Sequence, residues 1–251
     1  MTHFSPLIVI PARLASARLP KKPLALIGGI PMIVHCLHRA QEAKIADVIV
    51  AAADNEIVDA VTHYGGRAIL TDPDLPSGSD RVAAAVQEID PQKNYSHIIN
   101  FQGDLPLFAP QDLRYLLKDI DPTGSIVRTL ATRIDDAKEV SSDDVVKIQA
   151  GFAKETSGTI TRAIGFSRAA VPWGQGSYWH HVGVYGYPRH VLEEFVALPP
   201  SALEKREKLE QLRLLENGYG IEAVIIAEPA IGVDTPEDLA VVQALWNKRG
   251  K

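Results

Sequence analysis

Near the start of the chain stands the stretch Leu7-Ile8-Val9-Ile10-Pro11-Ala12-Arg13, from which the rest of the fold can be predicted. Its four consecutive apolar residues predict a short strand that is buried on both faces, as in a parallel sheet. The chain then enters a loop that carries Arg18, Lys21 and Lys22. A strand that ends in a cationic loop is typical of α/β proteins, whose ligands lie beyond the carboxyl ends of the strands.

The residues that follow alternate between short apolar runs and helical periods. We expect strands at 48–51, 68–70 and 98–101, and helices at 32–43, 56–64, 81–89 and 110–118. Their β-α-β-α order predicts a parallel sheet with helices on both faces. Because crossovers in such sheets are right-handed, ligands are expected at the edge formed by the carboxyl ends of the strands.

The pattern changes after about residue 120. We expect strands at 126–132, 145–149, 160–164, 182–187 and 221–226, with one charged helix at 203–216. Thr235-Pro236-Glu237-Asp238 opens a last helix, with Thr235 as its N-cap and Pro236 as its first residue. The sequence therefore predicts a single α/β domain with a mixed, mostly parallel sheet. Its core covers about 1–125 and 220–251, and a smaller β-rich lobe is inserted at about 126–219.

Composition and charge exclude several classes of protein. The formal net charge of −5 argues against a basic nucleic-acid surface. No apolar run reaches the roughly 20 residues that a membrane-spanning helix needs, and the start of the chain lacks the basic segment of a signal peptide. The single cysteine, Cys36, excludes an internal disulfide and is expected to be inert filler. We therefore expect a cytoplasmic enzyme that binds neither nucleic acid nor a membrane.

The loop after the first predicted strand holds four cations within ten residues, namely Arg13, Arg18, Lys21 and Lys22. Cations and backbone N–H groups at this edge of a sheet suit a polyphosphate. The alternative is an ordinary solvated basic loop, which the prolines and the position after a strand disfavour. The loop is not a P-loop, and no Gly-x-Gly-x-x-Gly follows a strand, so a dinucleotide dehydrogenase is not expected.

Two carboxylates occupy similar positions in the predicted sheet. Asp104 directly follows the strand at 98–101, and Asp234 lies between an apolar run and the last helix. Mg²⁺ takes one or two carboxylates and keeps several waters, so the two aspartates suit a site that faces phosphates. Each also has an ordinary interpretation, because aspartate is common in turns after glycine and at helix starts.

Two further polar segments have more than one interpretation. Ser77-Gly78-Ser79-Asp80-Arg81 lies between a strand and a helix, where it could approach a base or ribose or could simply cap the helix. His180-His181 precedes the strand predicted at 182–187. No further histidine or cysteine is spaced to complete a zinc site, so His181 is interpreted as a polar substrate contact.

Seven motifs, in one order over nearly the whole chain, resemble the 3-deoxy-manno-octulosonate (Kdo) cytidylyltransferases, or CMP-Kdo synthetases. They are Pro11 to Pro23, Gln102-Gly103-Asp104, Phe166-Ser167-Arg168-Ala169, Val171-Pro172-Trp173, His181 to Tyr187, Leu209 to Arg213 and Gly232 to Asp238. The resemblance implies a Rossmann-like nucleotidyltransferase core with a smaller dimerisation lobe, and a homodimer. It also implies that CTP and Kdo give CMP-Kdo and pyrophosphate with Mg²⁺, for lipopolysaccharide assembly.

The resemblance also implies roles for individual residues. The nucleotide-binding positions are Pro11, Ala12, Arg13, Arg18, Lys22, Ser77, Gly78, Arg81, Gln102 and Gly103. The catalytic positions are Arg13, Arg18, Lys22, Asp104 and Asp234, of which the two aspartates are the magnesium ligands. The sugar-binding positions are Arg168, His181, Tyr185, Glu210 and Gln211.

The chain departs from the common family pattern at three places. Lys21 stands where the loop usually carries glycine, and Leu105 stands where glutamate usually follows Gly-Asp. The segment 52–56 lacks the usual Thr-Asp pair, so either Asp54 replaces it one position later or its role is absent.

Two rival functions follow from the same residues. The first is transfer to another sugar acid. The second half of the chain argues against a sialic acid, whereas an amino-substituted Kdo would leave no mark. The second is a catalytically silent binding protein, which would be expected to lose a metal carboxylate or a loop cation, and none of these is lost.

Overall fold

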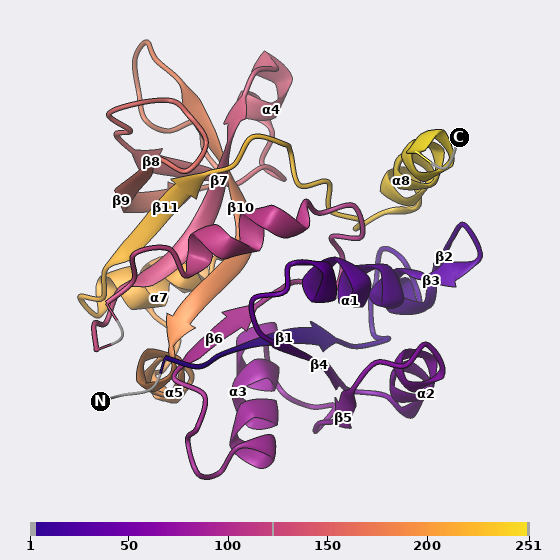
Figure 1. Ribbon diagram of the computed structural model, residues 1–251. Coiled ribbons are helices and arrows are strands. Elements are labelled where there is room, and N and C mark those ends of the chain that lie inside the picture. Colours follow the sequence, from indigo (N-terminus) through magenta and orange to yellow (C-terminus); the bar gives the residue numbers. More distant parts are fainter. Residues whose placement is uncertain (1–3, 122, 250–251) are drawn as a thin grey trace. The chain divides into compact units, whose positions relative to one another are not determined.

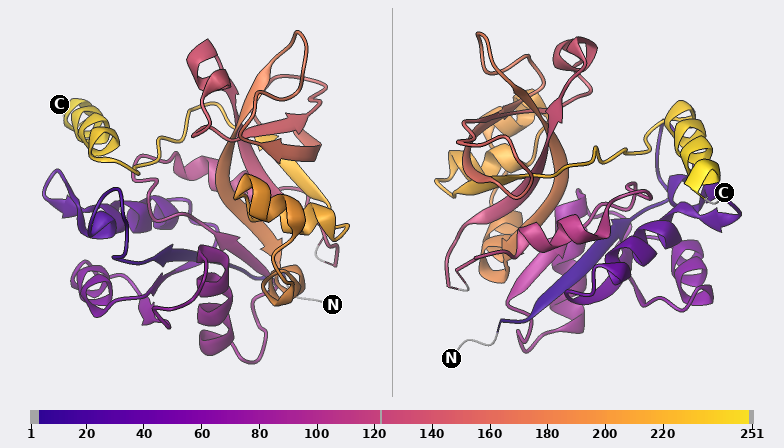
Figure 2. Two further views of the ribbon diagram at one scale, coloured as in Figure 1. Left: turned by 180° about the vertical axis from the view of Figure 1, so that it is seen from behind. Right: turned by 45° about the horizontal axis from the view of Figure 1, so that its top comes forward.

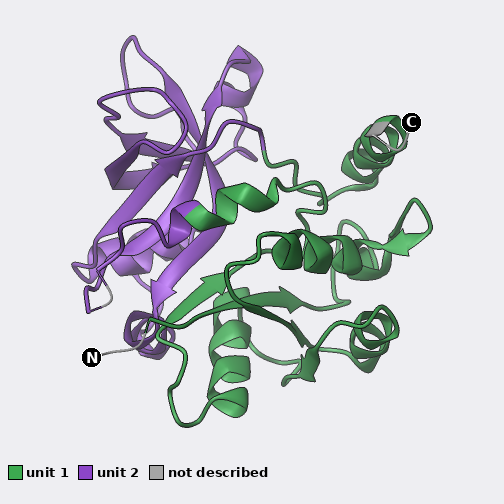
Figure 3. Cartoon of the chain, in the orientation of Figure 1, with its two compact units in different colours: residues 1–114, 230–251 green, residues 115–229 purple. Residues whose placement is uncertain are grey.

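The computed structural model describes residues 4–121 and 123–249. The chain divides into two compact units, Met1–Arg114 with Ala230–Lys251 and Tyr115–Pro229, coloured green and purple in Figure 3. The second unit begins before and ends after the lobe expected at 126–219. No helix among the described residues is long and apolar enough to cross a membrane.

The first unit is built on four parallel strands in the order β5-β4-β1-β6. Their bounds are β1 Pro6–Ala12, β4 Asp47–Ala52, β5 Ala68–Leu70 and β6 His97–Asn100. Ile8 lies beside Val48 on one side and Ile99 on the other, and all three are buried. The parallel sheet and the strands predicted in this half are therefore confirmed.

The helices that pack against this sheet are α1 Met32–Glu42, α2 Asn55–His63 and α3 Gly78–Ile89. The chain also forms the 3₁₀ helix η2, Pro110–Leu116, at the end of this part of the first unit, and the last helix α8, Pro236–Arg249. Figure 1 shows α1 and α3 on opposite sides of β1, as right-handed crossovers require. Past the end of α2, Gly65 adopts a φ of 76°, a left-handed conformation that glycine reaches at no steric cost. The helix predicted at 110–118 is present as a shorter 3₁₀ helix.

A small hairpin and the last helix form a second core in the first unit. The short 3₁₀ helix η1, Lys22–Leu24, leads into β2, Leu26–Ile27, which pairs with β3, Ile30–Pro31. Ile27 packs in one cluster with Val233 and Val242, and α8 lies beside β2 in both views of Figure 2. This cluster also includes Leu19, so it attaches the cationic loop to the chain around Asp234.

The second unit holds a mixed sheet in the order β10-β7-β11-β9-β8. Its strands are β7 Val127–Ile134, β8 Lys147–Ala150, β9 Ile160–Ser167, β10 Tyr178–Pro188 and β11 Ile221–Ile225. Only β7 and β11 are a parallel pair among its described pairings. The sequence predicted that His180 and His181 precede this strand. Because β10 begins at Tyr178, they lie inside it instead.

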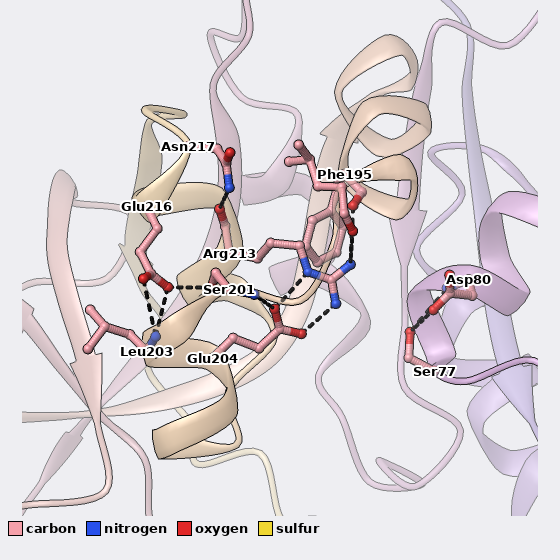
Figure 4. Close-up of polar contacts among 10 residues, drawn as sticks. Ser77, Asp80, Phe195, Ser201, Leu203, Glu204, Arg213, Glu216 and Asn217 are labelled. Atoms are coloured by element: carbon pink, nitrogen blue, oxygen red, sulfur yellow. Dashed lines mark hydrogen bonds and ion pairs between the residues drawn. The ribbon is translucent and has the colours of Figure 1, made fainter.

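The helices of the second unit are α4 Ala137–Ser141, α5 Arg189–Ala197, α6 Ala202–Glu207 and α7 Gln211–Glu216. The prediction of one continuous helix at 203–216 is wrong, because Lys208 adopts a left-handed φ of 58° and separates α6 from α7. The two helices stay together through Arg213, whose Nε donates to Glu204 Oε2 at 2.8 Å (Figure 4). Glu204 also completes a capping box with Ser201 at the start of α6.

Candidate active site

A pocket of about 370 Å³ lies in the first unit beyond the carboxyl ends of β1 and β6. It is lined by all the residues that the sequence assigned to nucleotide, metal or catalysis. These are Pro11, Ala12, Arg13, Arg18, Lys22, Ser77, Gly78, Arg81, Gln102, Gly103, Asp104 and Asp234. Parallel strands bring the segments that follow β1, β5 and β6 to one edge, and Asp234 joins them although more than two hundred residues separate it from Pro11 in the chain.

Lys22 lies between the two carboxylates of this pocket. Its Nζ donates to Asp104 Oδ2 at 2.8 Å and to Asp234 Oδ1 at 2.9 Å. Burial by itself would lower the pKa of the Lys22 ammonium, but the two carboxylates outweigh burial and hold this pKa above its usual value. Arg18 Nη2 lies 3.1 Å from Asp234 Oδ2. Both oxygens of Asp234 therefore face a cation.

The position of Asp104 depends on close packing of the preceding residue. A Cβ atom on Gly103 would lie 3.0 Å from the backbone oxygen of Pro11 and 3.1 Å from the side chain of Ile33. Glycine therefore lets the turn after β6 lie directly on the end of β1. The backbone N–H of Val233 donates to the Asp104 carbonyl at 3.0 Å, which joins the two carboxylate segments directly.

Asp234 is held by the start of α8. The carboxylate of Asp238 accepts from the N–H of Asp234 at 3.0 Å and of Thr235 at 2.9 Å. In return the N–H of Asp238 donates to the Thr235 hydroxyl at 3.2 Å. This reciprocal arrangement confirms Thr235 as the predicted N-cap. Burial raises the pKa of Asp238, but the hydrogen bonds from Asp234 and Thr235 outweigh it and hold the pKa below its usual value.

The cationic loop is also fastened to the start of α2, which the sequence did not predict. The Asp54 carboxylate accepts from the backbone N–H of Leu14 at 2.8 Å. The Nζ of Lys21 donates to Glu56 Oε2 at 2.8 Å, with both side chains more than half exposed. Lys21 itself adopts a left-handed φ of 54°, the conformation that favours glycine. The loop therefore keeps a glycine-like turn although a lysine occupies it.

The Ser77–Arg81 segment both caps a helix and lines the pocket. Ser77 accepts from the N–H of Asp80 at the start of α3, at 3.2 Å, and its hydroxyl donates to the Asp80 carboxylate (Figure 4). Arg81 is buried, and its Nη1 donates to the carbonyl of Asp72 at 2.9 Å. Burial, followed by the neighbouring Arg13, lowers the pKa of Arg81. Arg81 thus lines the pocket and holds the chain around Asp72 in place.

The five predicted sugar-binding residues all belong to the second unit. The rings of His181 and Tyr185 are in contact, with centroids 5.4 Å apart. The His181 Nε2 lies 3.1 Å from the hydroxyl of Thr129. Burial and then His180 lower the pKa of His181 to about 3, so this ring is neutral near pH 7. Burial, then Tyr187 and Glu210, raise the pKa of Tyr185, whose hydroxyl stays protonated.

Of the remaining three, Glu210 directly precedes α7, whereas Gln211 and Arg168 sit in different surroundings. Gln211 begins α7 and is buried, and its Nε2 has no hydrogen-bond partner among the described residues. The guanidinium of Arg168 donates from Nε to the Glu207 carbonyl at 3.0 Å and from Nη1 to the Asp143 carbonyl at 2.8 Å. The backbone N–H of Arg168 donates to the Glu207 carboxylate at 3.1 Å. Arg168 is therefore held at both its backbone and its head group.

Zinc is not supported for the paired histidines. Within residues 4–121 and 123–249, no three histidine, cysteine, aspartate or glutamate side chains gather to hold a metal ion. His180 and His181 point to opposite faces of β10, as neighbours in a strand do. Cys36 is fully buried in α1, which agrees with its expected role as filler.

The comparisons with known proteins agree with one another. A family model described as cytidylyltransferase matches residues 7–224. The 3-deoxy-manno-octulosonate cytidylyltransferase of Parvibaculum lavamentivorans is 52% identical over 244 residues, which cover 97% of this chain and 93% of that protein. The protein of the same name from Rhodospirillum rubrum is 50% identical over 243 residues, covering 96% and 95%.

A solved structure is similar over the same length. The structure of CMP:2-keto-3-deoxy-manno-octonic acid synthetase complexed with CTP matches with a TM-score of 0.87 and 38% identity. The match covers 98% of this chain and 99% of that chain. The resemblance inferred from the motifs is therefore confirmed, together with the nucleotidyltransferase fold that it implied.

Proposed function

This chain belongs to the family of 3-deoxy-manno-octulosonate cytidylyltransferases, and we propose that it transfers CMP from CTP to the anomeric hydroxyl of Kdo. The oxygen of that hydroxyl loses its proton to solvent and forms a bond to the α-phosphorus. The bond from this phosphorus to the oxygen that bridges to the β-phosphate breaks, and pyrophosphate leaves. One observation carries the proposal. Loop cations and two carboxylates from distant segments line a single pocket at the carboxyl edge of a parallel sheet.

The loop cations suit the part of the reaction in which negative charge builds up on the leaving group. We assign Arg13, Arg18 and Lys22 to the β- and γ-phosphates, because guanidinium and ammonium groups stabilise phosphate oxygens by charge-assisted hydrogen bonds. Ser77, Gly78 and Gln102 line the same pocket and are assigned to the ribose and cytosine. In such a displacement the protein mainly positions both substrates and neutralises their charge.

The residues present also fit a divalent cation. Asp104 and Asp234 offer hard oxygen atoms that already lie within hydrogen-bond distance of one and the same ammonium. Their side chains are 28% and 50% exposed, which leaves room for the waters that Mg²⁺ retains. We therefore assign these two aspartates to Mg²⁺. When bound, the ion would supply positive charge where two anionic substrates approach each other.

We assign the recognition of Kdo to the second unit. A guanidinium such as that of Arg168 suits the carboxylate of a sugar acid. The neutral ring of His181 and the protonated hydroxyl of Tyr185 suit sugar hydroxyl groups, with Glu210 and Gln211 as further polar contacts. The buried Gln211 Nε2, which has no hydrogen-bond partner within residues 4–121 and 123–249, supports this assignment, because a buried donor normally finds an acceptor.

The decisive experiment measures pyrophosphate release with a panel of nucleotides and sugar acids, with and without Mg²⁺. We expect release with CTP, Kdo and Mg²⁺ together. Faster release with 8-amino-Kdo or a sialic acid would change the acceptor and leave the reaction class intact. CTP binding without release, for any acceptor, would favour the silent binding protein.

Three wider expectations accompany this proposal. CMP-Kdo is the activated sugar for lipopolysaccharide assembly, so we expect the enzyme to act in the cytoplasm of a Gram-negative bacterium. The dimerisation lobe implied by the family leads us to expect a homodimer, which light scattering of the purified protein would test. A molar mass of one chain over a range of concentrations would refute the dimer without affecting the proposed reaction.

A further inference from the structure

We propose that Lys22 is an internal substitute for the divalent cation, so that the metal binds tightly only when a triphosphate draws Lys22 away from the two aspartates. This inference rests on the proposed function, because it takes Asp104 and Asp234 as the metal ligands. It adds an order to the events at that site: nucleotide and metal strengthen each other's binding, and the nucleotide-free protein holds the metal weakly.

The first argument is the place that Lys22 occupies. Its Nζ lies 2.8 Å from Asp104 Oδ2 and 2.9 Å from Asp234 Oδ1, and the other oxygen of Asp234 faces Arg18 at 3.1 Å. A divalent ion held by both aspartates would meet these cations, because both oxygens of Asp234 and one oxygen of Asp104 already face them. Two like charges cannot share one pair of carboxylates at such distances without strong repulsion. The metal and the Lys22 ammonium therefore compete for one position.

The second argument is that the competing cations have another place to go. Lys22 follows directly on the loop that lines the pocket, and its side chain is 17% exposed, on a long flexible stem. The side chain of Arg18 is 60% exposed. A triphosphate that enters the pocket offers both cations several anionic oxygens in exchange for the carboxylates. The carboxylates are then free for the metal.

The third argument is thermodynamic. If the triphosphate raises the affinity for the metal by releasing the aspartates, the metal must raise the affinity for the triphosphate by the same factor. Binding of the pair is therefore favoured over binding of either alone. In the nucleotide-free protein, Lys22 and Arg18 also neutralise the two aspartates, which would otherwise repel each other.

The test measures Mn²⁺, a hard cation that replaces Mg²⁺ at oxygen sites, by the electron paramagnetic resonance signal of the free ion. No sugar acid is added, so no turnover occurs. We expect Lys22→Met to bind Mn²⁺ about tenfold more tightly than the unaltered protein when no nucleotide is present, within the range typical of coupled sites. CTP should raise the Mn²⁺ affinity of the unaltered protein strongly and that of Lys22→Met much less.

Two control variants make the result specific. Lys22→Arg keeps the positive charge and should leave Mn²⁺ binding weak. Lys21→Met removes the neighbouring lysine, which pairs with Glu56 and not with the aspartates, and should leave the Mn²⁺ affinity unchanged. Thermal unfolding of each variant checks that the fold is intact. Equal Mn²⁺ affinity in Lys22→Met and the unaltered protein would overturn the proposal.

A double variant separates failure of this inference from failure of the metal assignment. Asp104→Asn should abolish the tight Mn²⁺ binding of Lys22→Met. If it does not, the metal lies elsewhere and the assignment of Asp104 fails. If Asp104→Asn abolishes the CTP-dependent binding while Lys22→Met changes nothing, the aspartates are ligands and only the competition by Lys22 is refuted.

Discussion

The backbone N–H of Leu14 donates a 2.8 Å hydrogen bond to the carboxylate of Asp54. Asp54 occupies the N-cap position of α2, yet its side chain makes no capping bond to its own helix. Instead it reaches back to the cationic loop, while the N–H of the adjacent Ala53 donates to the Ala12 carbonyl at 2.9 Å. The end of β4 therefore sets the path of the loop that follows β1.

Replacing Asp54 tests whether this bond positions the loop for the nucleotide. Asp54→Ala should raise the KM for CTP about tenfold, because a hydrogen bond to a charged group contributes about 1.5–3 kcal/mol and Asp54 is only half-buried. Asp54→Asn keeps an oxygen acceptor and should recover most of the loss. Steady-state kinetics on both substrates would measure the effect. An unchanged KM for CTP in Asp54→Ala would mean that the loop holds its path without Asp54.

Replacing Asp104 tests whether it is a ligand of the metal. Asp104→Ala should lower kcat by roughly 10²–10³, as expected when a group that acts on the developing charge is removed. Binding of CTP in the absence of Mg²⁺, measured by calorimetry, should largely survive, because Arg13 and Arg18 remain. Turnover at the normal rate in Mg²⁺ would contradict the assignment of Asp104.

The sequence predicted the edge of the sheet but not the contacts made there. A buried run such as Leu7–Ile10 favours a central parallel strand, and parallel strands bring their following loops together. The loop after β1 and Asp104 after β6 were therefore predictable neighbours, whereas Asp234 reaches Asp104 through the hydrogen bond from the Val233 N–H. The position of Lys22 between them was not, because it depends on the rotamer of one long side chain and on a 3₁₀ turn.

Local sequence patterns did not predict the structure at two other places. The charged segment at 203–216 was predicted as one helix, yet Lys208 is left-handed, and the pair Glu204–Arg213 needs the two halves to fold back on each other. The hairpin of β2 and β3 has strands of two residues each, too short for any hydrophobic period to mark them.

His181 gives a prediction about pH and stability. The pKa of its ring falls from 6.5 to about 3 on folding, because the ring is desolvated and lies beside His180. Between these two pH values the unfolded chain takes up a proton that the folded chain does not. The stability that the neutral His181 ring contributes is therefore complete above pH 6.5 and is lost as the pH falls toward 3.

His181→Gln should remove this part of the acid sensitivity. Melting temperatures at pH 7, 6 and 5 should fall less steeply in the variant than in the unaltered protein, while His63→Gln, at an exposed position, should change nothing. In kinetics, His181→Ala should raise the KM for Kdo far more than the KM for CTP. Equal losses for both substrates would mean that His181 does not belong to the sugar site.

Glu207 tests how Arg168 is held for the carboxylate of Kdo. The Glu207 carboxylate accepts from the Arg168 N–H and from the Ser167 hydroxyl, each at 3.1 Å, and the ammonium of the buried Lys147 donates to the Arg168 carbonyl. The peptide groups of Arg168 thus lie between an anion and a cation, which fixes where its guanidinium points.

Glu207→Ala should therefore raise the KM for Kdo about tenfold, by loss of a charge-assisted hydrogen bond, and leave the KM for CTP unchanged. Glu207→Gln keeps one acceptor oxygen, so its KM for Kdo should fall between those of Glu207→Ala and the unaltered protein. Glu216→Ala is the matched control on α7, because Glu216 accepts from the N–H of Leu203 and does not contact Arg168. It should lower the melting temperature without a selective effect on Kdo. If Glu207→Ala folds normally and binds Kdo unchanged, Arg168 either keeps its position without Glu207 or does not bind the sugar acid. Arg168→Lys would distinguish these outcomes, because this variant loses only the planar guanidinium.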